Sequence, residues 1–158
     1  MKEEIRQKFS MSLYHGARII LGIVFIYSSY DKILHPAAFT KIIYNYQILP
    51  DELVNLSAIF LPWLELTIGS LLITGVWLPG SVFISNILLI IFFCALMYNK
   101  ARGLDISCGC FSTSEGEAPE STLYLSRDFT FVVIAVYLFF KVFITNSAGI
   151  KSPSRRIP

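Results

Sequence analysis

The sequence has little charge, few histidines and few cysteines, and each scarcity narrows the possible function. Charged residues make up 15% of the 158 residues and sum to only +2, so nothing in the charge pattern indicates nucleic-acid binding. The three cysteines include a close pair, Cys108 and Cys110, and neither histidine (His15 or His35) lies near that pair. Because zinc prefers four ligands, the pair makes a poor zinc site, and we assign no metal site.

Apolar residues are abundant where charged residues are scarce. They make up 54% of the chain, and the mean hydropathy is +0.62. Soluble domains average about 45–50% apolar residues even with glycine counted, and glycine is not counted here. Four stretches approach the roughly 20 apolar residues that a spanning helix needs. They predict an all-α integral membrane four-helix bundle in contact with the lipid bilayer, with helices over residues 13–33, 53–76, 80–98 and 128–145.

The segments outside these spans predict the orientation. The first span is interrupted by Arg18 and is followed by no small-residue cleavage site, so we expect a retained helix and not a secretory signal. Four spans place both termini on one side, and basic residues lie in segment 1–12 and in the tail 146–158. An excess of Lys and Arg marks the cytoplasmic face. We therefore expect cytoplasmic termini in the inner (plasma) membrane and a periplasmic or extracellular loop over residues 100–127.

The segment between the first and second predicted spans has apolar residues at helical spacing. Phe39, Ile42, Ile43 and Tyr46 follow the spacing i, i+3, i+4, i+7, which predicts a short helix with one apolar face. That face would lie either on the membrane surface or over the mouth of the bundle, and the spacing does not separate the two.

The cysteine pair lies in "LDISCGCFST", residues 104–113. Residues separated by one in an extended strand lie about 6.6 Å apart. A disulfide allows roughly 4.4–6.8 Å between α-carbons, so a bridge from Cys108 to Cys110 needs a bend, which Gly109 permits. A ring this small removes little chain entropy, whereas strained and exposed disulfides are the easily reduced ones. The pattern favours redox exchange over a structural bridge.

Other roles for the cysteines stay open. The pair also suits Cu(I), as a copper or heavy-metal site, or two free thiols of no consequence. The protein would otherwise be a non-catalytic membrane scaffold for a thiol enzyme. Lys100 and Arg102 lie close enough in sequence to favour a thiolate. We expect the third cysteine, Cys94, to pack as a buried small hydrophobe, with a resolving thiol as the alternative.

Ionisable residues also fall inside the predicted spans. Glu65 lies near the middle of the second span, where acids usually face the bundle interior and pair with a base. We expect Arg18 to be that base, either as a clamp between helices or as part of a proton-relay or quinone site. Arg127 and Asp128 open the fourth span, where Asp128 suits the positive end of the helix dipole.

Five motifs occur in one order along the chain: "GARIILGIVFIYSSYDKILHPAAF", "YQILP", "LPWLELTIGSLLITG", "RGLDISCGCF" and "LSRDF". Together they resemble the DoxX-like membrane family and, within it, the MauE branch of methylamine-utilisation proteins, over nearly the whole stretch from Leu13 to Lys141. The positions that match the family are Arg18, Lys32, Pro62, Trp63, Glu65, Cys108, Gly109, Cys110, Phe111 and Arg127. Ser112 departs from the glycine that commonly follows "CGCF".

The resemblance implies a function. The MauE branch is associated with maturation of a disulfide-rich periplasmic enzyme subunit beside a thioredoxin-like partner, and other DoxX-like proteins are linked to sulfur oxidation and quinone. We therefore expect a membrane thiol:disulfide oxidoreductase with Cys108 and Cys110 as its redox pair and a periplasmic thioredoxin-fold protein as its partner. Its supporting residues would be Gly109, Phe111, Arg102, Glu65, Arg18 and Arg127, with Cys94 as the candidate resolving thiol. We expect no firmly bound cofactor, with quinone as the candidate electron acceptor; nothing in the sequence indicates methylamine itself.

Overall fold

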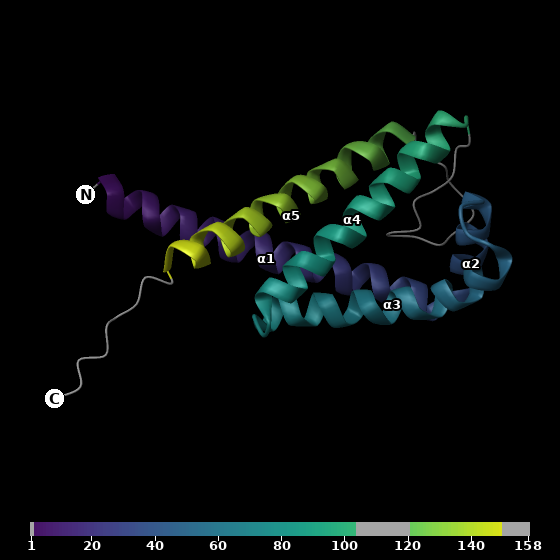
Figure 1. Cartoon of the computed structure of the whole chain (residues 1–158), viewed down its shortest axis with the longest axis horizontal. Coiled ribbons are helices and arrows are strands. Elements are labelled where there is room, and N and C mark those ends of the chain that lie inside the picture. Colours follow the sequence, from purple (N-terminus) through teal and green to yellow (C-terminus); the bar gives the residue numbers. More distant parts are fainter. Residues whose placement is uncertain (1, 104–120, 150–158) are drawn as a thin grey trace.

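The structure is a computed structural model that describes residues 2–103 and 121–149. Its helices are α1 (Lys2–Leu34), α2 (Pro36–Tyr46), α3 (Asp51–Thr74), α4 (Leu78–Ala101) and α5 (Ser121–Gly149). No strand occurs in these two ranges, so the predicted all-α fold is confirmed. Four long helices form the bundle, and the short α2 lies at one end of it (Figure 1).

The long helices have the length and composition of membrane spans. Within the described ranges, three segments are long and apolar enough to cross a bilayer: Lys8–Leu34, Asp51–Thr74 and Leu78–Ala101. Large apolar side chains such as Ile23, Phe60 and Ile91 are exposed on their outer faces, which suits contact with lipid and not water. The chain is therefore a multi-pass helical membrane protein, and the crossing of the membrane by α5 stays a prediction.

Two helices extend well beyond the predicted spans. Helix α1 begins at Lys2 instead of residue 13, and α5 covers 121–149 instead of 128–145. The added residues of α1, "KEEIRQKFSMS", contain neither proline nor glycine and include several good helix formers, so nothing in them ends the helix. Apolarity located the spans, but it does not mark where a helix ends.

Helices α1 and α3 approach each other closely at a pair of glycines. A Cβ atom on Gly69 would lie 2.9 Å from the carbonyl oxygen of Gly22, and one on Gly22 would lie 3.1 Å from the carbonyl oxygen of Gly69. Small residues let membrane helices pack backbone to backbone. This contact sets which residues of α1 face α3.

A tight turn joins α3 to α4. Gly75 has a φ of 80° and Trp77 a φ of 50°, so two of the three turn residues are left-handed. The turn consists of Gly75, Val76 and Trp77, and Pro79 and Gly80 already lie in the first turn of α4. From this turn α3 and α4 diverge towards the end of the bundle that holds α2 (Figure 1).

Helix α2 packs against the bundle. Its predicted apolar face exists, and Phe39 and Ile42 on that face are buried against the protein. At the opposite end of the bundle, the second half of α5 lies beside the first half of α1 (Figure 1), where Lys141 Nζ donates a hydrogen bond of 2.7 Å to Ser10 Oγ. The N-terminus and the end of α5 thus share one end of the bundle, as four spans require.

The contact between Gly22 and Gly69 predicts that the same substitution, glycine to alanine, lowers stability at one position of the bundle and not at another. We expect Gly69→Ala to destabilise the protein by about 1–3 kcal/mol, because the added methyl group overpacks the α1–α3 contact. Gly16→Ala is the matched control, since nothing lies within 4 Å of its added Cβ. It should be neutral or stabilising by up to about 1 kcal/mol from helix propensity. Thermal unfolding in detergent measures both, and equal midpoints for the two variants would contradict the contact.

Candidate functional site

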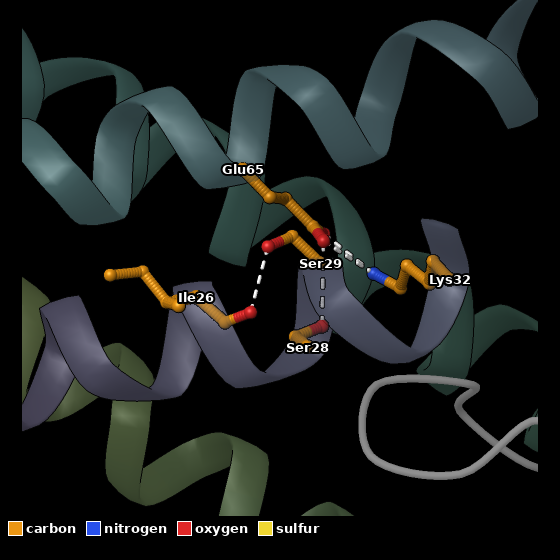
Figure 2. A network of polar contacts seen from close by, with 5 residues as sticks. All are labelled: Ile26, Ser28, Ser29, Lys32 and Glu65. Atoms are coloured by element: carbon orange, nitrogen blue, oxygen red, sulfur yellow. Dashed lines mark hydrogen bonds and ion pairs between the residues drawn. The ribbon is translucent and has the colours of Figure 1, made fainter. Parts of the chain in front are cut away.

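A buried ion pair joins α1 to α3. Lys32 Nζ donates hydrogen bonds of 2.6 and 2.8 Å to the two carboxylate oxygens of Glu65, and Ser28 Oγ lies 3.4 Å from Glu65 Oε2 (Figure 2). The side chains of Lys32 and Glu65 are only 1% and 2% exposed. Charged side chains inside a membrane bundle are energetically costly and rare, and those that occur usually have a functional role. This pair is therefore the centre of the candidate site.

Helical spacing explains how α1 presents two donors to one carboxylate. Ser28 and Lys32 are four residues apart, so they lie on the same face of α1, one turn above the other. The neighbouring Ser29 donates instead to the carbonyl oxygen of Ile26, at 2.8 Å (Figure 2). Each Glu65 oxygen thus receives at least one hydrogen bond, as a buried carboxylate requires.

Two aromatic rings enclose the ammonium group. Lys32 Nζ lies 4.8 Å from the ring centre of Phe39 on α2 and 5.1 Å from that of Phe92 on α4. Both distances are within the range of a cation–π interaction, which strengthens when the cation is desolvated. The rings therefore stabilise the charge and close the pair off from the surroundings.

Helix α5 adds a second carboxylate. A cavity of about 40 Å³ is lined by Ser28, Glu65 and Asp128 among apolar side chains. The guanidinium of Arg127 donates two hydrogen bonds of 3.2 Å to Asp128 Oδ1. Burial, and secondarily the negative charge of Asp128, raises the pKa of Tyr46 on α2, so this phenol stays neutral near the carboxylate. Together with Lys32, Phe39 and Phe92, these residues bring all five helices to one site.

An apolar cleft adjoins this site. It has a volume of about 180 Å³ and lies where α2, α3 and α4 meet, with Leu61 of α3 and Ala95 of α4 in its walls. Phe39 and Phe92 also line it, so the rings that enclose Lys32 form part of its wall. Apolar side chains make up nearly all of its walls.

The expected pairing of Glu65 with Arg18 is wrong. The guanidinium of Arg18 packs over Gly75, where an added Cβ would lie 2.9 Å from Nη1. Arg18 lies fourteen residues before Lys32, which is about 21 Å along a helix and beyond the reach of its side chain. In the sequence, Lys32 stands out only as a position that matches the family, and no partner is predicted for it. Lys32 lies four residues after Ser28, and this helical spacing is the sequence pattern that indicates that the two side chains share one face of α1.

The remaining predicted site residues are spread out. Cys94 is exposed on α4, so the prediction of a buried small hydrophobe is wrong: position 94 faces away from the side of α4 that buries Leu96 and Asn99. Arg102 donates a 3.0 Å hydrogen bond to the Gln47 side chain and lies over the ring of Tyr98. Four predicted site residues lie outside the described residues: Cys108, Gly109, Cys110 and Phe111. Among the residues that the structure describes, no group of three or more His, Cys, Asp or Glu could hold a metal ion.

The buried ion pair predicts that removal of its second charge restores the stability lost when the first is removed. We expect Lys32→Met to destabilise the protein by about 3–5 kcal/mol, because it leaves Glu65 buried without its cation. The double variant Lys32→Met, Glu65→Leu should regain most of that loss, since it leaves neither charge unpaired. Lys41→Met, at an exposed position of α2, is the control and should unfold like the wild type. Thermal unfolding in lipid nanodiscs measures all three, and a Lys32→Met variant as stable as the control would contradict the assignment.

Comparison with known proteins identifies the family. The family described as "Methylamine utilisation protein MauE" matches residues 10–141. The methylamine utilization protein MauE of Paracoccus denitrificans is 31% identical over 121 residues, which cover 75% of this chain and 64% of that protein. The protein of the same name from Methylorubrum extorquens is 33% identical over 95 residues, covering 60% and 51%.

The chain thus matches less than two thirds of the length of each of these relatives, and no solved structure matches it. The wider DoxX-like grouping stays a prediction. The family match nevertheless covers most of the chain, including both partners of the buried pair, and the chain belongs to the MauE family.

Proposed function

We propose that this protein is a membrane thiol:disulfide oxidoreductase that acts in methylamine utilisation, with Cys108 and Cys110 as its redox pair. Two relatives are named as methylamine utilization proteins, which supports a role in methylamine utilisation. The cysteine spacing supports the chemistry, because a C-x-C bridge forms a small, strained and reducible ring. The partner is a periplasmic thioredoxin-fold protein, and the outcome is maturation of exported disulfide-containing proteins.

One structural observation carries the proposal. The end of α4 and the start of α5 lie at the end of the bundle that holds α2, away from the start of α1 and the end of α5 (Figure 1). Arg102 fixes this end of α4 to α2 through its hydrogen bond with Gln47. The described residues on either side of the cysteine pair thus belong to the end of the bundle where α2 covers the Lys32–Glu65 pair, which supports a role for the cysteines on that side. In this proposal the termini are cytoplasmic, the segment is periplasmic, and the membrane is the inner one.

The exchange balances without a further reactant. A thiolate of one pair attacks a sulfur of the other pair's disulfide and forms a mixed disulfide. The second thiol of the attacking pair then breaks that bond. One disulfide forms and one is broken, and two electrons and two protons pass from the dithiol to the pair that was oxidised. The chemistry therefore reverses with the relative potentials of the two pairs.

Net turnover needs an electron acceptor, and we infer a lipid-soluble quinone. When bound, such a molecule accepts two electrons and two protons, which is what the reoxidation of a dithiol requires. The apolar cleft of about 180 Å³ between α2, α3 and α4 offers apolar walls to the ring of such a molecule. Phe39 and Phe92 would hold the ring by stacking, and Lys32 lies directly behind them.

Redox trapping in intact cells tests the cysteine pair. A membrane-impermeant alkylating reagent is applied before and after mild reduction, and the labels on the peptide with both cysteines are counted by mass. We expect two labels only after reduction, in the wild type and in the control Cys94→Ser. Full labelling without reduction, or no labelling at all, would contradict an external disulfide.

Single variants test the exchange itself. One of Cys108→Ser and Cys110→Ser should accumulate a mixed disulfide with a thioredoxin-fold protein, because the second thiol that resolves it is missing. Cys94→Ser should accumulate none. A Cys108→Ser, Cys110→Ser variant that keeps full function would instead favour a scaffold, and stoichiometric Cu(I) bound by this pair, with no mixed disulfide, would favour metal binding.

A further inference from the structure

Residues with polar side chains from three helices help to line the mostly apolar cavity beside the ion pair. Ser28 of α1, Glu65 of α3 and Asp128 of α5 line it, and these residues are 6%, 2% and 8% exposed. The rest of the lining is apolar and includes Leu89, Phe92 and Phe131. Two buried carboxylates on different helices therefore face one small space.

The space is large enough for water. A cavity needs about 10–15 Å³ to hold one water molecule, and this one offers about 40 Å³. Buried water requires two to four polar partners, and the two carboxylates and the serine hydroxyl supply them. We propose that the cavity is a hydration site whose water joins Glu65 to Asp128 and exchanges protons between the Lys32–Glu65 pair and the start of α5.

The charged groups around the cavity make this exchange electrically balanced. Lys32 faces Glu65 from α1, and Arg127 faces Asp128 from its own helix. The phenol of Tyr46 on α2 lies near Asp128 but lines the apolar cleft and not this cavity. The part of α4 that lines the cavity contributes only Leu89, Phe92 and Phe93. Two cations and two carboxylates sum to zero, so a proton that moves within the set leaves the total charge unchanged.

The proton path follows from the contacts. At 2.6 Å, a proton on Lys32 Nζ is in position to pass to Glu65, breaking an N–H bond and forming an O–H bond. Glu65 passes a proton to the water, and the water passes one to Asp128. The result is a neutral Lys32 and a neutral Asp128, and no oxidant or reductant takes part. The site thus moves protons whether or not the cysteine pair is redox-active.

Filling the cavity tests the proposal without touching a charge. In bilayers, water-edited solid-state NMR should show magnetisation transfer from water to the carboxyl carbons of Glu65 and Asp128. Leu89→Phe places a larger side chain in the cavity wall and should abolish the transfer to Glu65. Ile90→Phe is the matched control, because Ile90 is 46% exposed on the outer face of the same helix, and it should keep the transfer.

Exchange kinetics test the connection to Asp128. After transfer to D₂O, the Lys32 ammonium protons should exchange at least tenfold more slowly in Asp128→Asn and in Leu89→Phe than in the wild type. Asp51→Asn, an exposed acid on α3, and Ile90→Phe should leave the rate unchanged. No water contact at Glu65 in the wild type, or wild-type exchange in Leu89→Phe, would overturn the proposal. Neither result bears on the redox proposal, which is tested by the labelling of Cys108 and Cys110.

Discussion

A charged side chain in a membrane interior needs a partner of opposite charge, and the end of the bundle that holds α2 is organised around that requirement. Lys32 and Glu65 are almost wholly buried, so each depends on the other and on the groups that surround them. Ser28 bonds the carboxylate, while Phe39 and Phe92 close over the ammonium. An apolar pair can stabilise a helix contact nearly as well as a buried ion pair, so the presence of two charges here points to a use.

The pair depends in turn on how closely α1 and α3 approach. Gly22 and Gly69 leave no room for a Cβ at their contact, and this fixes the register of the two antiparallel helices. With that register set, the Ser28–Lys32 face of α1 lies opposite Glu65, whereas Arg18 lies near Gly75 at the turn. A helix contact without any polar group thus decides which cation meets the acid.

The sequence predicts the helices and the presence of an intramembrane acid, because apolarity and charge are local properties. It also predicts the apolar face of α2, since Phe39 and Ile42 follow the helical repeat. It fails at Arg18 and at Cys94, because pairing and exposure depend on helix register and rotation, which no single segment encodes. The pairing of Lys32 with Glu65 is not predicted for a related reason: the direction in which a lysine near the end of a span points depends on the rotation of its helix.

Helix α2 links the parts of the site that the spanning helices leave separate. Phe39 of α2 closes over Lys32 and also lines the apolar cleft, so one ring belongs to both. Gln47, which follows α2, holds Arg102 at the end of α4, directly before the segment with the paired cysteines. Helix α2 therefore contributes to the enclosure of Lys32 and to the wall of the cleft, and the residue that follows it bonds the end of α4. One short helix outside the spans thus contacts the buried pair, the cleft and the end of α4 at once.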